Sequence, residues 1–270
     1  MDVTRLGIAT VARSDWGHTT QLRTALRCAW VHHPVRGDLS RFDAILIPTD
    51  RWEMGEIACR ALGQGVPIVQ LHAGESTPNA FDDDVRHFVS RIAALRLCCH
   101  DVHRQRLLSM GIPAATIHVT GAPGLDRLTL PRMSRRVLGR HLRLDPERRW
   151  AIVIQHPTTR AVVDPAKEQQ HIFAAIGNRQ AIWFTPCQDP GREAYTHDRM
   201  IECVTDAEWR ALLHEADVLI GNSSALVIEA PFVGLRTVEI GVRQQGRERV
   251  SYGDGKSVPR IVKILEEWTA

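Results

Sequence analysis

Six polar side chains of this 270-residue sequence stand just after predicted strands or at the starts of predicted helices. Parallel α/β folds bind ligands outside the carboxyl ends of their strands. Carboxylates and imidazoles there can take and give protons, and a hydroxyl beside free backbone N–H groups suits a phosphate. Each position also has an ordinary explanation, such as a helix N-cap or a surface loop, so only the set indicates a site. The six are Arg13, Asp50, His72, Asp82, His156 and Ser223.

The stretch 219–243, LIGNSSALVIEAPFVGLRTVEIGVR, predicts a strand, a tight polar turn, a helix over 225–233 and a second strand. A strand, helix and strand in succession form a βαβ unit, which implies a parallel sheet. The turn places small residues and free N–H groups at a helix N-terminus, whose partial positive charge suits a phosphate. Ser223 could equally act only as the N-cap of that helix.

Similar α/β patterns occupy the two halves of the chain. Strands are expected at 5–11, 43–47, 66–71, 95–99 and 117–119, and again at 150–154, 181–185, 217–220 and 237–240. The predicted organisation is an N-terminal Rossmann-like domain at 1–126, a basic connector at 127–149, a second Rossmann-like domain at 150–250 and a C-terminal helix within 251–270. The six polar residues are expected to line one cleft between the two domains.

Composition excludes several classes of protein. A net charge of +3 is too small for a nucleic-acid groove, and the basic run 132–149 carries leucines at helical spacing, as a solvated helix face does. The six cysteines form no C-x-x-C pair, which predicts free thiols in a reducing, cytoplasmic compartment and no disulfide framework or zinc site. No apolar run approaches membrane-spanning length. The sequence thus predicts neither a metal nor a cofactor.

Seven ordered motifs make the sequence recognisable: RSDWG, PTDR, HAGE followed by DDDVRH, GAPGLD, QHPTT, GNSSALVIEAP and GVRQQGR. Together they closely resemble the UDP-N-acetylglucosamine 2-epimerase family, and the nearer match is its hydrolysing branch, which forms N-acetylmannosamine for sialic-acid-like sugars. The resemblance runs from residue 7 to residue 265. It implies two Rossmann-like domains facing across a cleft, the GT-B arrangement, with the C-terminal helix packing back on the N-terminal domain.

The resemblance also implies roles for individual residues. His72 stands where many members carry a catalytic Glu, although some hydrolysing members also have His there. Ser223 and Ser224 match the serines that bind the diphosphate, and Glu229 matches the acid that holds the ribose. The implied catalytic set is Asp50, His72, Asp82 and His156, and the implied substrate-binding set is Arg13, Glu75, Arg86, Ser223, Ser224, Glu229 and Arg243.

The sequence is markedly shorter than the family pattern. A strand–helix segment is expected to be missing between Leu26 and Arg41. After Arg249 the chain passes almost directly to SYGDGKSVPRIVKIL, which resembles the family's last helix, so part of the nucleotide domain's edge is expected to be lost.

The favoured function is hydrolysis of a UDP-N-acetylhexosamine with inversion at C2, through a 2-acetamidoglucal intermediate. The predicted partner is a UDP-sugar, without nucleic acid or membrane, and a homodimer is plausible by resemblance. Three alternatives stay open: a non-hydrolysing 2-epimerase, a GT-B glycosyltransferase, and a nucleotide-sugar binding protein with weakened catalysis.

Overall fold

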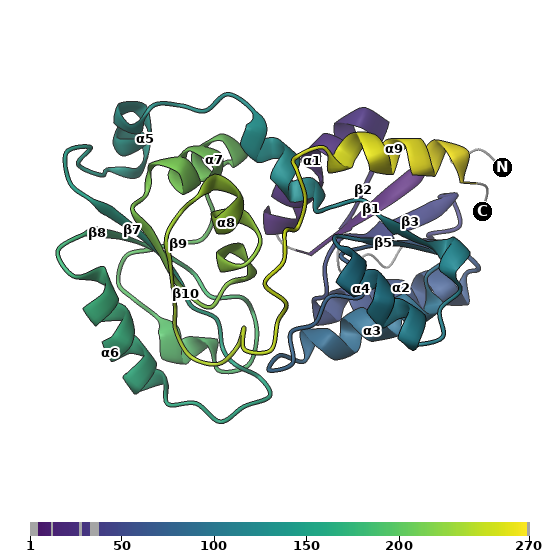
Figure 1. Ribbon diagram of the computed structural model, residues 1–270, viewed down its shortest axis with the longest axis horizontal. Coiled ribbons are helices and arrows are strands. Elements are labelled where there is room, and N and C mark those ends of the chain that lie inside the picture. The colour runs from purple at the N-terminus through teal and green to yellow at the C-terminus, as the bar shows by residue number, and fades with distance from the viewer. Residues whose placement is uncertain (1–4, 12, 27–28, 33–37, 269–270) are drawn as a thin grey trace. The chain divides into compact units, whose positions relative to one another are not determined.

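The computed structural model describes residues 5–11, 13–26, 29–32 and 38–268. The chain divides into two compact units, each built on a parallel sheet (Figure 1). Unit 1 contains residues 1–76, 82–129 and 250–270, and unit 2 contains residues 77–81 and 130–249. The predicted α/β class with two Rossmann-like domains is confirmed.

Unit 1 holds six parallel strands in the order β2-β1-β3-β4-β5-β6. The strand order reverses between β1 and β3, and the carboxyl ends of such strands mark the usual ligand site of an open α/β sheet. The elements are β1 (Leu6–Thr10), α1 (Arg13–Leu26), β2 (Ala29–His32), β3 (Ala44–Ile47), α2 (Trp52–Gly63), β4 (Ile68–Leu71), α3 (Asp82–Ile92), β5 (Leu95–Cys98), α4 (Asp101–Ser109), η1 (Ala114–Thr116), β6 (Ile117–Val119), η2 (Pro123–Thr129) and α9 (Ser257–Glu267).

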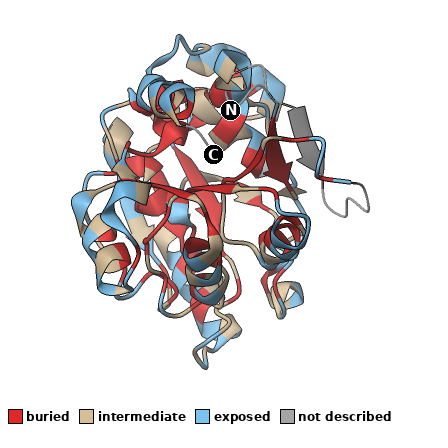
Figure 2. Ribbon diagram, turned by 90° about the vertical axis from the view of Figure 1, so that its right-hand side faces the viewer, coloured by how far each residue is buried: buried red, intermediate tan, exposed pale blue. Residues whose placement is uncertain are grey.

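Both faces of this sheet are buried, as a parallel sheet requires. Alternate residues of β3 show the two layers: Ile45 and Ile47 pack with α2 and α3, whereas Ala44 and Leu46 face the side covered by α1 and α9. Figure 2 shows the buried strands between helices whose outer faces are exposed.

The C-terminal helix α9 packs beside α1 on the unit 1 sheet, as predicted (Figure 1). Both carboxylate oxygens of Asp126 accept hydrogen bonds from the first turn of α9, from the N–H groups of Ser257 (2.9 Å) and Val258 (2.7 Å). A carboxylate at a helix N-terminus satisfies unpaired donors and complements the helix dipole. Asp126 therefore fixes the start of the helix that completes this core.

Unit 2 holds a second parallel sheet, with the strand order β11-β10-β7-β8-β9. The order reverses between β7 and β10, so the segments after these two strands meet at a switch point. The elements are α5 (Arg135–Leu142), β7 (Trp150–Ile154), α6 (Pro165–Ile176), β8 (Gln180–Phe184), η3 (Arg192–Tyr195), β9 (Met200–Ile201), α7 (Asp206–Glu215), β10 (Val218–Gly221), η4 (Ser224–Leu226), α8 (Glu229–Val233) and β11 (Thr237–Glu239).

Two expectations for local structure are wrong. The helix predicted over 225–233 is divided into the 3-10 turn η4 and the five-residue helix α8, and Val227 and Ile228 lie between them, outside both elements. The strand expected to be missing between Leu26 and Arg41 is present as β2, which pairs with β1. The absence of a helix from this segment stays a prediction, because residues 33–37 lie outside the described residues.

Within the described part of the chain, no helix combines the length and apolar character needed to cross a bilayer. The described cysteines are free thiols: Cys59, Cys98, Cys99, Cys187 and Cys203.

Gly221 provides a test of the switch point in unit 2. Its φ is 132°, and an added Cβ would lie 1.9 Å from the carbonyl oxygen of Ile154 on the neighbouring strand. We expect Gly221→Ala to destabilise the protein by about 3 kcal/mol or more, because it adds strain to a steric clash. Gly63→Ala is the control, since nothing lies within 4 Å of its Cβ. Equal melting temperatures for the two variants would contradict this account.

Candidate active site

Arg86 is the centre of the polar residues in unit 1. Its side chain is 3% exposed and is bracketed by acids on two sides. One guanidinium nitrogen, Nη2, donates to Asp50, which follows β3, and the other, Nη1, donates to Asp83 in the first turn of α3. Nη1 also lies 3.2 Å from the backbone oxygen of Glu75. The Arg86 guanidinium thus links the segments that follow β3 and β4 to the first turn of α3.

The charge of Arg86 is stabilised by its neighbours. Burial opposes a charged guanidinium, but the carboxylates of Asp50, Glu75, Asp83 and Asp82 outweigh that effect and raise the pKa of Arg86 above its usual value. The helix that carries Arg86 is fixed from behind, because Gln70 of β4 donates to the Arg86 carbonyl oxygen at 2.9 Å and accepts from Ser90 at 2.7 Å.

His72 directly follows β4 and has a left-handed backbone, with φ at 54°. The chain then turns back through Gly74, so that Glu75 returns to the imidazole: His72 Nδ1 and Glu75 Oε1 are 2.6 Å apart. Glu75 is buried, whereas the His72 side chain is 16% exposed. A buried carboxylate on one ring nitrogen orients a histidine for acid–base chemistry at the other nitrogen.

In unit 2, His156 and Asn222 are joined across the switch point. The Asn222 side chain accepts from the His156 N–H at 2.7 Å and donates to the His156 carbonyl oxygen at 2.9 Å. The His156 ring accepts the Cys187 N–H on Nδ1 at 3.0 Å. A neutral imidazole that accepts on Nδ1 carries its proton on Nε2. His156 therefore presents Nε2–H as a donor.

Three of the four predicted binding residues of unit 2 have clear partners, and the fourth, Ser224, is exposed at the first position of η4. Ser223 caps η4, with its side chain accepting the Ala225 N–H at 3.3 Å, so the expected capping role is present. Arg243 donates to the Pro157 carbonyl oxygen (3.1 Å) and lies 3.5 Å from Asp189. The last of the predicted binding residues in this unit, Glu229, is 5% exposed and accepts the indole N–H of Trp209 at 2.9 Å.

The structure groups most of the residues named from the sequence. Asp50, His72, Glu75 and Arg86 lie together in unit 1, with Asp82 at the start of α3, and His156 adjoins the Asn222–Ser223 turn in unit 2. Arg13 is the first residue of α1, and its side chain lies outside the described part of the structure.

Sequence reasoning missed three residues of these groups. Asp83, three residues before Arg86 on one helix, had the i, i+3 spacing that could have revealed the pair. Asn222 stood beside Ser223, but its pairing with His156 is a contact across the sheet. Cys99 lies 3.3 Å from both His72 Nδ1 and Glu75 Oε1, and no local spacing signals that contact.

A family model described as UDP-N-acetylglucosamine 2-epimerase matches residues 38–251, well over half of the chain. The chain belongs to the UDP-N-acetylglucosamine 2-epimerase family. The family predicted from the motifs is therefore confirmed. The matched range contains every site residue predicted for this chain except Arg13.

Two curated relatives are named as hydrolysing members of this epimerase family. UDP-N,N'-diacetylbacillosamine 2-epimerase (hydrolyzing) of Legionella pneumophila is 33% identical over 220 residues, covering 77% of this chain and 58% of that protein. GDP/UDP-N,N'-diacetylbacillosamine 2-epimerase (hydrolyzing) of Campylobacter jejuni is 26% identical over 227 residues, with the same two shares. The chain thus spans 58% of the length of these relatives.

The fold is also similar to that of solved epimerases. The structure of Methanocaldococcus jannaschii UDP-GlcNAc 2-epimerase in complex with UDP-GlcNAc and UDP has a TM-score of 0.75 at 15% identity, covering 98% of this chain and 100% of that chain. At this identity, the similarity supports the fold alone.

Removing the Arg86 side chain tests its role in unit 1. We expect Arg86→Met to lower the free energy of unfolding by about 3–5 kcal/mol, because it leaves buried carboxylates without a cation. Arg91→Met on the same helix is the matched control; Arg91 is exposed, and we expect a change within about 0.5 kcal/mol. Urea denaturation measures both, and a loss below about 1 kcal/mol for Arg86→Met would contradict this account.

Proposed function

We propose that this chain is a hydrolysing 2-epimerase of a UDP-N-acetylhexosamine, UDP-GlcNAc or a 2,4-diacetamido relative, releasing UDP and an N-acetylmannosamine-type sugar. One observation carries the proposal: Asp50, held by buried Arg86, and His72, held by buried Glu75, follow the adjacent strands β3 and β4 of one sheet. This places two acid–base groups at one edge, each with its own orienting partner. The names of the two hydrolysing relatives support the branch.

The first step needs stabilisation of the leaving diphosphate. The C2 hydrogen of the sugar is not acidic, so the bond from C1 to the diphosphate oxygen must break, with its electron pair leaving on UDP. In the proposal Ser223, Ser224 and Arg243 bind that diphosphate in unit 2, with Arg13 as a further cation. Hydroxyls, backbone N–H groups and guanidinium groups all stabilise negative charge that develops on phosphate oxygens.

Proton transfer completes the reaction. A base removes the C2 proton and leaves a C1–C2 double bond, the 2-acetamidoglucal. Water then adds its oxygen at C1, while an acid returns a proton to the opposite face of C2, so that one water is consumed for each UDP released. In the proposal Asp50, His72, Asp82 and His156 supply these groups. His156 fits a donor role, since its Nδ1 is occupied by the Cys187 N–H.

Glu75 and Arg86 were predicted from the sequence to bind the substrate, but their burial favours a different role. At 2% and 3% exposed, they have little surface to offer a sugar. We propose that both are positioning residues, Glu75 for His72 and Arg86 for Asp50.

A second function, a nucleotide-sugar binding protein with weakened catalysis, is favoured by His72, which stands where many members of the family carry a catalytic Glu. A protein with the nucleotide-binding residues but an incomplete catalytic set would bind a UDP-sugar without turning it over.

Proton NMR of UDP-GlcNAc incubated with the protein in D₂O tests these possibilities together. The hydrolysing enzyme is expected to release UDP and a free mannose-configured sugar carrying deuterium at C2. If no UDP is released from any UDP-N-acetylhexosamine, the proposal fails. UDP-ManNAc as product would also be inconsistent with it, because that product indicates the non-hydrolysing reaction. UDP release that depends on an acceptor, without deuterium at C2, indicates a glycosyltransferase. Binding without turnover indicates the weakened binder.

Calorimetry with UDP tests the nucleotide site separately from catalysis. We expect Glu229→Gln to weaken UDP binding by about tenfold, roughly 1.4 kcal/mol, because a hydrogen bond from a ribose hydroxyl to a carboxylate loses its charge. The amide oxygen can still accept the Trp209 N–H, so the fold should be retained. Glu239→Gln at the exposed end of β11 is the control and should bind UDP as the unchanged protein does. Equal affinities for all three proteins would remove Glu229 from the site.

A further inference from the structure

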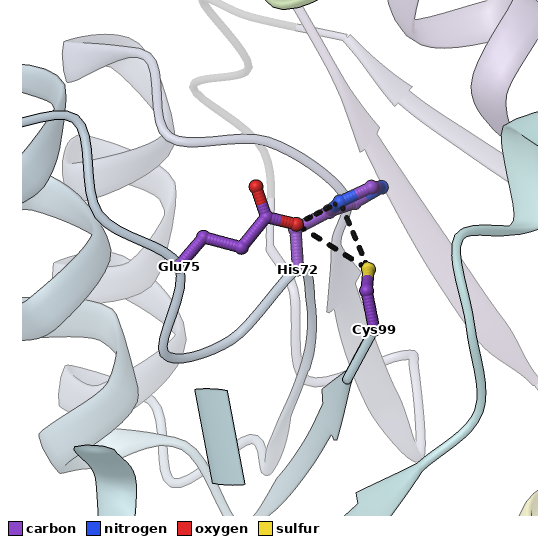
Figure 3. A group of neighbouring side chains, drawn as sticks. All are labelled: His72, Glu75 and Cys99. Atoms are coloured by element: carbon purple, nitrogen blue, oxygen red, sulfur yellow. Dashed lines mark hydrogen bonds and ion pairs between the residues drawn. The ribbon is translucent and has the colours of Figure 1, made fainter. Parts of the chain in front are cut away.

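Three side chains that can each give an electron pair to a metal ion converge beside β4 (Figure 3). His72 Nδ1, Glu75 Oε1 and Cys99 Sγ are separated by 2.6 Å in one pair and by 3.3 Å in the other two. Glu75 and Cys99 are buried, and His72 is partly exposed. Among the residues that the structure describes, no other group of histidine, cysteine and acidic ligand atoms is as compact.

We propose that His72, Glu75 and Cys99 form a zinc-binding site, with the fourth coordination position open to water. A thiolate, an imidazole and a carboxylate are all common zinc ligands, and three protein ligands with one open position give a tetrahedral site. The thiolate makes the site poorly suited to Mg²⁺ or Ca²⁺, which prefer oxygen. The absence of C-x-x-C spacing predicted no zinc site, but these ligands come from separate segments that only the fold brings together.

The backbone holds the three ligands in place. Gly74 has φ at 76°, and an added Cβ would lie 2.4 Å from the carbonyl oxygen of His103. The turn from His72 to Glu75 is therefore confined between β4 and α4. Cys99 directly follows β5, the neighbour of β4 in the sheet. Its neighbour Cys98 takes no part, because its thiol donates to the His118 carbonyl oxygen at 3.4 Å and burial raises its pKa to about 12.

The distances suit a metal with little rearrangement. Ligand atoms about 2.0–2.3 Å from a tetrahedral zinc lie roughly 3.3–3.6 Å apart. The two separations from Cys99 Sγ are already 3.3 Å. Only the 2.6 Å hydrogen bond between His72 and Glu75 must open. Arg86 adds an opposing positive charge nearby, but it contacts the backbone oxygen of Glu75, which leaves Oε1 directed toward the other two ligands.

Zinc binding would displace protons. Without metal, the Cys99 thiol and His72 Nδ1–H both point at Glu75 Oε1. Zn²⁺ accepts an electron pair from each ligand atom, the thiol proton goes to solvent, and the Nδ1 proton of a neutral His72 moves to Nε2 by exchange with solvent. At least one proton is released per zinc, so the affinity should rise with pH. Under the proposed function, on which only this consequence rests, zinc would also withdraw His72 from acid–base work and inhibit the enzyme.

The direct test titrates the full-length, metal-free protein with Co²⁺ and Zn²⁺. We expect one equivalent of each ion to bind, with the intense near-ultraviolet band of a thiolate bound to Co²⁺ and the visible bands of tetrahedral cobalt. Cys99→Ser should lose the thiolate band and weaken zinc binding at least tenfold, about the least that losing a supporting group costs a metal site. Cys59→Ser, at an exposed thiol on α2, should behave as the unchanged protein.

The Co²⁺ spectrum of the unchanged protein tests the proposed metal site even if Cys99→Ser fails to fold. A Co²⁺ complex without a thiolate band, or zinc binding that Cys99→Ser leaves intact, would overturn the proposal. If the protein converts UDP-GlcNAc, zinc should inhibit it, and folded Cys99→Ser, if active, should need at least tenfold more zinc for the same fractional inhibition. Failure to find any turnover would count against the proposed function alone, because the cobalt spectrum does not depend on activity.

Discussion

The buried charge of Arg86 is the interaction on which the polar cluster of unit 1 depends. Taking a guanidinium out of water costs several kcal/mol unless acids surround it, and here Asp50 and Asp83 both pair with it. These acids come from the end of β3 and the start of α3, so the need to neutralise one cation fixes two segments at once. The Glu75 backbone oxygen adds the turn after β4 to the same contact. Positioning of acid–base groups and stability of the unit thus come from the same contacts.

In unit 2, the segments that follow β7 and β10 are linked by neutral groups. The diphosphate site proposed for unit 2 needs a close approach of backbone, and Gly221, where the strand order reverses, has no side chain to obstruct that approach. Asn222 bridges to both backbone groups of His156, so the segments after β7 and β10 hold each other in place. Because η4 and α8 are separate short elements, the diphosphate proposed to bind here would meet no long helix dipole.

The two proposed roles of His72, acid–base group and metal ligand, make different requirements of its imidazole ring. As an acid–base group it needs a carboxylate partner and one nitrogen available to a sugar, whereas as a metal ligand it would give Nδ1 to the ion. Both demands use the same strained turn and the same Glu75 carboxylate, and a left-handed backbone at a histidine is tolerated only where surrounding contacts fix it. Cys99 is what distinguishes the two proposals, because a thiol beside an imidazole and a carboxylate completes a set of zinc ligands.

The sequence by itself determined the family, the two parallel sheets and most of the strands, because apolar runs, turn residues and ordered motifs are local signals. It also named Asp50, His72, His156 and Ser223, since residues after parallel strands collect at the carboxyl edge of a sheet. Arg86 was named only from its resemblance to the family motif. Only the tertiary structure decided which of them touch. The Asp50–Arg86 pair, the Asn222–His156 bridge and the approach of Cys99 to His72 join residues 36, 66 and 27 positions apart, and no local periodicity specifies such contacts. The break between η4 and α8 escaped prediction because helical spacing in 225–233 reports which side chains are buried and does not specify whether the helix is continuous.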